Sequence, residues 1–384
     1  MTKPMFDYEA PGYRRIKETS LRYVHGMKLG DRPGRYRKEP GGDESFYGSY
    51  HGAHVLDLFG ELERFSPDDL DEWADNIRDD QSEYGIFAGS PELRAQRPGV
   101  DGMEPYWHVT RGHLWALRVL DRPPKYPLQF VEPLLDAKAL YRWVKKYNWG
   151  NSWAAGNQVL ACATALMAQR DWFGADNVDS VLEHGMYPAL EELLDPETGY
   201  WGTQFGADLP NGLFGTIHVT PIYFQQGWPL GELDRNVDST LACQLADGSF
   251  WPGGSDCPDF DGAYMMSNLA ELTDYRRDDL QAAARRYLEH ALMHEDPDGF
   301  GWRLHRRDST PDQWKARPHW IWKPGHADVV AEYRDEDPSR THIMLGSWFY
   351  PLSIALIAHM LRDTGYEGPY RLNPMSLHGG NVFS

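Results

Sequence analysis

The chain has 384 residues, of which 41% are hydrophobic and 13% aromatic, and its formal net charge is −19. This acidic balance excludes the basic footprint of a general nucleic-acid-binding protein, and no apolar window reaches the ~18 residues of a membrane span. The three cysteines form neither a disulfide framework nor a paired zinc motif. The first twenty residues contain no apolar signal core, so we expect a cytoplasmic protein, or an exported one whose signal has been removed.

Residues 1–55 are predicted to form an N-terminal arm. The stretch "HGMKLGDRPGRYRKEPGGDESFYGSYHGAH" is rich in glycine and arginine and has little helical pattern. Its basic side chains suit a lid over a groove that binds a uronate, and they are Arg32, Arg35, Arg37 and Lys38. An arm that packs on the sister subunit of a homodimer explains the stretch equally well. Tyr50 and His54, at its end, are candidate substrate contacts.

From residue 56 to residue 384 a short pattern recurs: polar residues, then a glycine, then one or two aromatic residues. The glycines are Gly85, Gly150, Gly199, Gly248, Gly299 and Gly346, and they are 65, 49, 49, 51 and 47 residues apart. Between them the apolar residues have helical spacing, as in "DDLQAAARRYLEHALM", whereas no segment alternates like a strand. "NQVLACATALMAQ" is apolar nearly all round, which is typical of an inner, buried helix. About six helical hairpins in one domain predict an all-α fold, an α/α toroid whose loops at one end line a central cavity.

The repeat around Gly248, "QLADGSFW", resembles the Gln–Asp-Gly–Trp repeat of the squalene cyclase and protein prenyltransferase superfamily. The resemblance implies the toroid fold, which also houses polysaccharide lyases and glycoside hydrolases, so the function has to come from the site. Class II cyclases carry an Asp-x-Asp-Asp acid motif soon after such a repeat. Here "DFDGAY" has Asp259 and Asp261, but Gly262 stands in place of the last aspartate. Ala263 occupies the cysteine position of the Asp-x-Cys zinc motif of prenyltransferases, so the resemblance implies no such zinc site.

Three interpretations of Asp259 and Asp261 remain open. Acids before "GAYMMSNLAEL" suit the positive end of a helix, as caps. Asp261 and the nearby Tyr264 suit a role facing a substrate. The resemblance to cyclases implies that Asp261 protonates an alkene.

The aromatic residues favour a glycan as substrate, because many lie beside polar residues and flat rings stack on sugars. A lyase that acts on a uronate needs a group that neutralises the carboxylate, a base and an acid. We assign His218 as base, Tyr223 as acid, and Asn157 with Arg317 as neutralising and binding groups. The further candidates for substrate binding are Trp107, His108, His113, Asn151, Trp153, His319, Trp320, Trp322 and Lys323. No cofactor is required, although the acids around Asp261 could hold a metal.

The sequence therefore predicts a carbohydrate-active enzyme, and more narrowly a polysaccharide lyase whose partner is an acidic poly- or oligosaccharide. The alternatives are a terpenoid-cyclase-like isomerase that uses Asp261, a glycoside hydrolase with two carboxylates, and a glycan-binding toroid without activity. A polar groove with basic and aromatic walls would indicate the lyase, and a closed apolar cavity the cyclase.

Overall fold

The computed structural model describes residues 13–296, 299–304, 306 and 344–361. These residues form helices joined by turns, with isolated β-bridges and no strand among them, so the predicted all-α class is confirmed. Within the described ranges, none of the helices combines the length and the apolar character needed to cross a bilayer. The chain divides into two compact units: unit 1 takes its described residues from 13–73, 232–306 and 344–361, and unit 2 from 74–231.

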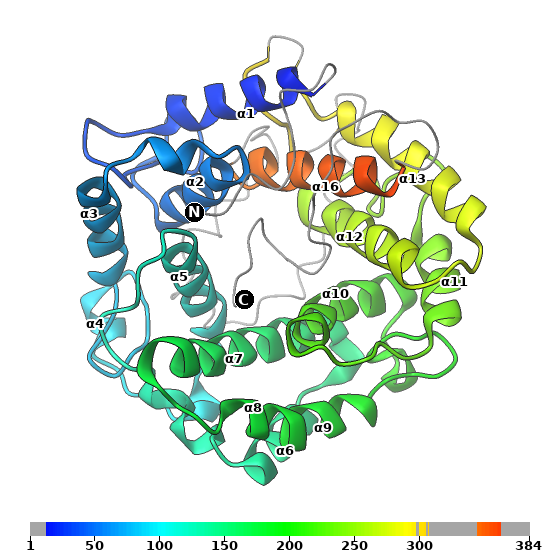
Figure 1. Ribbon diagram of the computed structural model, residues 1–384, viewed down its shortest axis with the longest axis horizontal. Coiled ribbons are helices and arrows are strands. Elements are labelled where there is room, and N and C mark those ends of the chain that lie inside the picture. The colour runs from blue at the N-terminus through cyan, green and yellow to red at the C-terminus, as the bar shows by residue number, and fades with distance from the viewer. Residues whose placement is uncertain (1–12, 297–298, 305, 307–343, 362–384) are drawn as a thin grey trace. The chain divides into compact units, whose positions relative to one another are not determined.

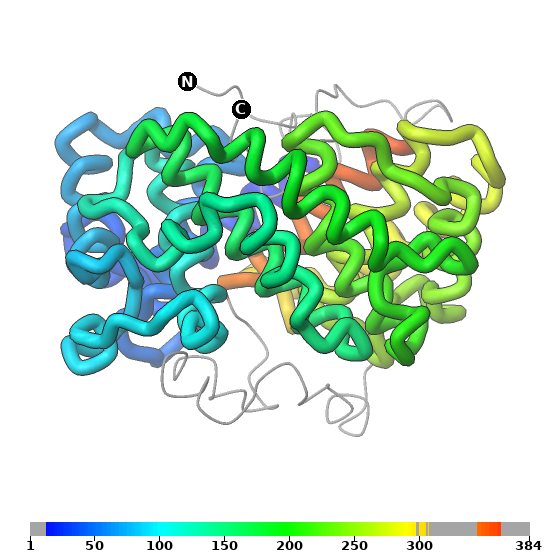
Figure 2. The backbone as a smooth tube through the Cα atoms, turned by 90° about the horizontal axis from the view of Figure 1, so that it is seen from below, coloured from blue at the N-terminus to red at the C-terminus, as the bar shows by residue number. Residues whose placement is uncertain are grey.

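Unit 2 is built around three inner helices, in which α7 packs against both α5 and α10. They are α5 (Trp107–Val119), α7 (Ser152–Phe173) and α10 (Leu209–Gln226). The outer elements are α6 (Ala137–Lys145), α8 (Val178–Val181), the π-helical turn η5 (Leu182–Met186) and α9 (Tyr187–Glu191). The short elements are α4 (Pro91–Arg94), η2 (Val100–Gly102), η3 (Gln129–Leu134), η4 (Trp149–Asn151) and η6 (Thr203–Phe205). The green segment of the tube in Figure 2 follows α7 to α10 as neighbouring helices.

Unit 1 repeats this arrangement, with α16 packed against both α2 and α12 (Figure 1). Its inner helices are α2 (Phe46–Leu58), α12 (Asp256–Leu272) and α16 (Gly346–Met360). Its outer helices are α1 (Arg14–Met27), α11 (Leu233–Cys243) and α13 (Arg277–Leu292). The short η1 (Glu61–Arg64) leads into α3 (Pro67–Arg78), which begins in unit 1 and ends in unit 2.

The sequence explains why outer and inner helices alternate. All residues from 155 to 169 of α7 are buried, because this stretch is apolar nearly all round. In α6, by contrast, only Leu140, Trp143 and Val144 are buried, on one stripe. Each unit thus consists of amphipathic outer helices paired with apolar inner ones. This pairing confirms, within each unit, the predicted helical hairpins of the α/α-toroid type.

Four of the six repeat glycines form tight turns between an outer and an inner helix. Gly85, Gly199, Gly248 and Gly299 have φ values of 95°, 70°, 88° and 71°, which favour glycine. The turn also needs space, because a Cβ at Gly85 would lie 2.4 Å from the carbonyl oxygen of Pro127. Gly150 and Gly346 differ, since they lie in or at the start of the helices η4 and α16. The six nearly evenly spaced glycines therefore have two different structural roles: four form turns, and two belong to helices.

The predicted N-terminal arm contributes a full hairpin instead. It forms α1 and most of α2, so the predicted boundary at residue 55 falls inside α2. The connecting segment is held by bridges from Lys28 to Tyr36 and from Arg37 to Glu44. Of its basic side chains, Arg32 pairs with Glu72 and Arg35 with Glu44. These contacts anchor the basic segment within unit 1.

Candidate functional site

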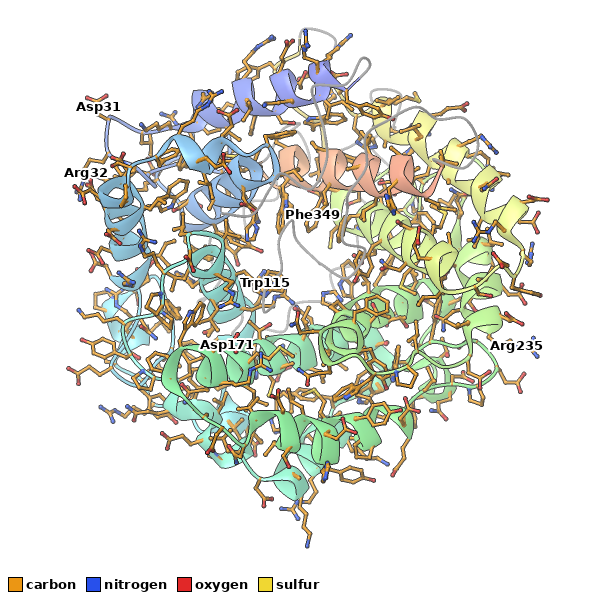
Figure 3. All side chains as sticks on the ribbon, in the orientation of Figure 1. Asp31, Arg32, Trp115, Asp171, Arg235 and Phe349 are labelled. Atoms are coloured by element: carbon orange, nitrogen blue, oxygen red, sulfur yellow. The ribbon has the colours of Figure 1, made fainter. Side chains whose placement is uncertain are left out.

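One face of α5 carries three polar or aromatic side chains. His108, Arg111 and Trp115 have the spacing i, i+3 and i+7, which places them along one side of the helix. The Arg111 guanidinium lies 4.5 Å from the ring centroid of Trp115, and its Nη2 lies 3.3 Å from His108 Nδ1. Arg111 and Trp115 are buried, whereas His108 is partly exposed. Trp115 is labelled on α5 in Figure 3.

The neighbouring helix α7 fixes the arginine. Arg111 Nη1 donates a hydrogen bond of 2.6 Å to Oδ1 of Asn157, and the asparagine is also buried. A charge-assisted hydrogen bond of this kind holds the guanidinium in one orientation. The amide NH₂ of Asn157 remains beside it as a further donor. A positive charge and a neutral donor therefore lie together on two inner helices.

His218 comes from α10, which crosses α7 at very close range. A Cβ at Gly156 would lie 2.6 Å from the carbonyl oxygen of Gly215 and 3.1 Å from Cβ of His218. At Gly215 an added Cβ would lie only 1.8 Å from Ser152 Oγ. The two glycines thus let the helix backbones touch. This crossing places His218 against the helical turn that carries Asn157.

The surroundings of His218 keep its imidazole neutral. Burial and the positive charge of Arg111 lower the pKa of His218 to about 3, against the opposing effect of its hydrogen bond with Phe214. Nδ1 lies 2.6 Å from the carbonyl oxygen of Phe214 and must donate to it. In the neutral ring the lone pair is then on Nε2. We name His108, Arg111, Trp115, Asn157 and His218 the Arg111 cluster.

Two predicted residues, Asn151 and Trp153, lie at the N-terminal end of α7. Asn151 caps α7 by accepting from the N–H of Ala154 at 3.4 Å. Asn211, the residue that sequence reasoning missed here, accepts from the N–H of Trp153 at 3.2 Å. The Trp153 ring lies 4.8 Å from that of Phe214. These contacts hold the ends of α7 and α10 together, so we interpret Asn151 and Trp153 as positioning residues.

The structure does not bring Tyr223 to His218. Tyr223 lies on α10 but is fully buried, and its hydroxyl donates to Glu191 Oε1 at 2.7 Å. Burial, together with the bond to Glu191, raises the pKa of Tyr223 above its ordinary value. Its ring packs 5.3 Å from that of Trp201 and 5.4 Å from that of Trp228. Tyr223 therefore belongs to the core between α10 and α9.

Trp107 and His113 also lie in the core, around α5. Trp107 is 1% exposed and makes edge contacts with Phe130 at 5.4 Å and Trp143 at 5.7 Å. His113 Nδ1 bonds to the carbonyl oxygen of Val109 at 2.8 Å, and its ring is stacked in the same core. Both side chains stabilise the packing of α5, and His113, two residues along from Arg111, lies on the opposite side of the helix.

The remaining predicted residues lie in unit 1 or outside the described residues. Tyr50 and His54 are on α2, where His54 stacks on Trp348 at 4.3 Å. Asp261 and Tyr264 are buried on α12. Arg317, His319, Trp320, Trp322 and Lys323 lie outside the described residues.

The capping interpretation holds for Asp259. Its carboxylate accepts from the N–H groups of Ser255, the N-cap of α12, and of Phe250, each at 2.8 Å. Asp261 is not in the first turn of α12.

Sequence reasoning missed Arg111 and Trp115. The signal is present in "HVTRGHLW", where His, Arg and Trp recur on one helical face. It was hidden because the same eight residues also include His113, which faces the core.

No family model matches the chain, and no curated protein matches it. Among solved structures, the GH76A α-1,6-mannanase from Salegentibacter sp. HEL1_6 is 13% identical, covers 90% of this chain and 99% of its own, and has a TM-score of 0.47. An inactive variant of that mannanase in complex with α-1,6-mannotetrose is 12% identical, with coverages of 90% and 98% and the same TM-score. The polysaccharide lyase BACCELL_00875 is 12% identical, covers 89% and 97%, and has a TM-score of 0.44. These neighbours are glycan-processing enzymes, and a likeness this distant assigns neither chemistry nor substrate to this chain.

Proposed function

We propose that this chain is a carbohydrate-active enzyme that cleaves an acidic glycan by β-elimination at the Arg111 cluster. The observation that carries the proposal is the hydrogen bond from Arg111 to Asn157 beside a histidine whose pKa is lowered to about 3. A fixed positive charge, an amide donor and a neutral imidazole are the groups that abstraction of a proton next to a carboxylate requires.

Arg111 and Asn157 are assigned to the carboxylate of a uronate. The α-proton of a free carboxylate is too weakly acidic to be removed, because the product would carry a second negative charge. A guanidinium is planar and matches a carboxylate with two parallel hydrogen bonds. The NH₂ group of Asn157 adds a third donor. The buried ring of Trp115, over which the guanidinium lies, helps to hold Arg111 in this position.

His218 is assigned as the base. Its Nε2 lone pair takes the C5 proton, the C4–O bond breaks as the C4–C5 double bond forms, and the imidazolium returns the proton to the leaving oxygen. No proton is gained or lost overall. A pKa of about 3 makes a weak base, but a bound carboxylate offsets the charge of Arg111 and raises that pKa. The base therefore becomes stronger when the substrate is present. In this scheme His218 also delivers the proton that we first assigned to Tyr223.

The test is ultraviolet absorbance of the purified protein mixed with alginate, glucuronan, pectate, hyaluronan and ulvan. Elimination creates a double bond conjugated to the carboxylate, so we expect absorbance to rise with one of these polymers. His218→Gln should abolish the rise. Tyr223→Phe is the matched control on the same helix, because its hydroxyl bonds to Glu191 away from the Arg111 cluster.

Three outcomes would contradict the proposal. New reducing ends without a rise in absorbance indicate hydrolysis, as in a glycoside hydrolase. Binding of these polymers without cleavage indicates a glycan-binding toroid. Equal loss of activity in His218→Gln and Tyr223→Phe would show that the histidine supports the structure of α10 and does not act as the base.

A further inference from the structure

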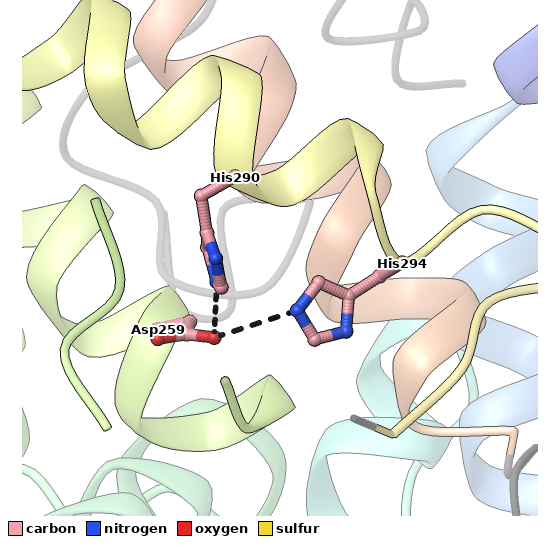
Figure 4. Close-up of side chains that lie close together, drawn as sticks. All are labelled: Asp259, His290 and His294. Atoms are coloured by element: carbon pink, nitrogen blue, oxygen red, sulfur yellow. Dashed lines mark hydrogen bonds and ion pairs between the residues drawn. The ribbon is translucent and has the colours of Figure 1, made fainter. Parts of the chain in front are cut away.

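Unit 1 contains a second histidine cluster that the proposed function does not use. Asp259, His290 and His294 bring their ligand atoms within 4.8 Å of one another, and all three side chains are fully buried. Figure 4 shows the two imidazoles directed at the same carboxylate. We name these three residues, with Tyr350, the Asp259 cluster.

The donor atoms of the Asp259 cluster converge on Oδ2 of the aspartate. His290 Nε2 lies 2.8 Å from Asp259 Oδ2, and His294 Nε2 lies 4.0 Å from it. The hydroxyl of Tyr350 lies 3.2 Å from His294 Nε2 and 3.4 Å from Asp259 Oδ2. Two imidazole nitrogens, one carboxylate oxygen and one phenol oxygen thus lie close enough to surround a single ion.

The outer contacts orient two of these ligands. His294 Nδ1 bonds to the carbonyl oxygen of Arg303 at 2.9 Å, so the ring donates there and its Nε2 lone pair is directed toward Asp259. Metal-bound histidines usually make this outer hydrogen bond. The carboxylate is held by the backbone N–H groups of Phe250 and Ser255, each at 2.8 Å. For His290, Nδ1 makes no hydrogen bond, so this ring lacks such support.

The same turn in another hairpin shows that the helix needs no aspartate here. In unit 2, Thr110 Oγ1 accepts a hydrogen bond of 3.5 Å from the N–H of Phe87. Asp259 accepts the corresponding bond from the N–H of Phe250 in unit 1. Thr110 is the fourth residue of α5, and Asp259 is the fourth residue of α12. A hydroxyl is therefore sufficient to accept the hydrogen bond from this turn, whereas Asp259 adds a buried charge with two histidines.

The turn before α12 is also shaped around the histidines. A Cβ at Gly254 would lie 2.5 Å from His294 Nε2 and 2.9 Å from Cε1 of His290. Its φ of 80° also favours glycine. The backbone at Gly254 therefore approaches both imidazole rings more closely than a residue with a Cβ at this position would allow.

We propose that Asp259, His290 and His294 bind one divalent transition-metal ion, with Tyr350 as the fourth ligand. Two imidazoles and oxygen ligands in a four-coordinate set fit zinc best. In the neutral ring of His290, a bound ion takes the Nε2 lone pair and the ring proton is then on Nδ1. The site is closed to solvent, so the ion is structural and joins α12 to α16 and to the end of α13. The proposal is independent of the proposed activity.

The experiment is a titration of the full-length, chelator-treated protein with Co²⁺, followed by visible absorbance, and then with Zn²⁺. We expect d–d bands of a tetrahedral site that saturate at one Co²⁺ per chain and disappear as Zn²⁺ replaces it. Zinc should also raise the Tm of the chelator-treated protein. A wild-type protein that shows neither saturation at one equivalent nor a shift in Tm overturns the proposal, and the cluster is then a hydrogen-bond network only.

Variants locate the ion within the chain. His290→Gln and His294→Gln should each weaken Co²⁺ binding at least about 10–100-fold, with the larger loss for His294, whose ring is supported by Arg303. His184→Gln is the control, because His184 is exposed on the π-helical turn of unit 2. Unchanged affinity in both cluster variants, or an equal loss in the control, places the ion elsewhere and overturns the assignment.

Discussion

The Arg111 cluster and the Asp259 cluster both place histidines on or beside inner helices, but around charges of opposite sign. In unit 2 a guanidinium lies beside His108 and His218, which are partly exposed. In unit 1 a carboxylate lies between two fully buried histidines. A cation beside reachable imidazoles suits an anionic substrate that enters and leaves. An anion enclosed with two imidazoles suits a permanent cation or a permanent hydrogen-bond network.

The comparison also shows how one kind of helical hairpin supports different sites. In both units a turn with a positive-φ glycine precedes the inner helix. The residue two positions after that glycine donates its N–H to a side chain of the helix. The acceptor is Thr110 in one hairpin and Asp259 in another. The side chain at this position differs between the two hairpins, so the turn determines where a group is held, and the sequence determines its charge.

The largest expected effect comes from removal of the buried carboxylate. Asp259→Ala leaves two backbone N–H groups and His290 without their acceptor, so we expect a loss of about 3–5 kcal/mol in the free energy of unfolding. Thr110→Val, at the matched position of α5, should cost about 0.5–1.5 kcal/mol. Urea denaturation in the presence of a chelator measures both. Equal losses would mean that Asp259 is only a turn acceptor.

Arg111→Gln should have the next largest effect, on activity. The amide cannot neutralise a carboxylate, so kcat/KM on the cleaved polymer should fall about 10²–10³-fold. Arg118→Gln is the control on the same helix, because Arg118 pairs with Asp171, labelled in Figure 3. A loss of similar size in the control would show that the effect comes from α5 as a whole.

The crossing of α7 and α10 predicts a moderate effect on stability. Gly156→Ala forces a Cβ toward the Gly215 carbonyl and the His218 side chain, which should cost about 1–3 kcal/mol. Gly89→Ala, where a Cβ meets nothing within 4 Å, should be nearly neutral. Thermal or urea unfolding distinguishes the two. If both variants are as stable as the parent protein, the helices do not need this close contact.

The smallest expected effect is on the pH dependence of stability. The pKa of His218 is about 3 in the folded protein and ordinary in the unfolded chain, so the unfolded state binds the extra proton below about pH 6.5. Stability is therefore lost as the pH falls through this window. As the pH falls from 6 to 4, the free energy of unfolding of His218→Gln should therefore rise relative to that of the parent protein by up to about 1.4 kcal/mol per pH unit. Parallel stability curves for the two proteins would contradict the lowered pKa.

Much of the fold could be predicted from local patterns. The apolar stretch "NQVLACATALMAQ" became the buried centre of α7, and four repeat glycines became turns. The spacing could not show that Gly150 and Gly346 belong to helices, because a glycine beside an aromatic residue gives the same sequence pattern in a turn and in a helix. The helical hairpin within the predicted arm was missed because α2, with two glycines and several aromatic residues, is buried on nearly all sides.

The site could be predicted only in part. His108, Asn157 and His218 were named as candidates and lie in the Arg111 cluster. Tyr223 was named with them although five residues along a helix amount to about 140° of rotation. Helical geometry alone would have separated it from His218. The Asp259 cluster had one local signal, His290 and His294 four residues apart. Asp259 is 31 residues from His290, and its place depends on how α12 packs against α13.

The most direct test of the account is the pKa of His218, measured by NMR in the free protein and with the uronate oligosaccharide that the enzyme cleaves. We predict that the free imidazole stays neutral down to pH 5, because burial and Arg111 disfavour its charge. The pKa should rise when the uronate oligosaccharide binds and stay unchanged with a neutral oligosaccharide. An ordinary pKa near 6.5 in the free protein, unaffected by either sugar, would contradict the assignment of Arg111 and His218 to one site.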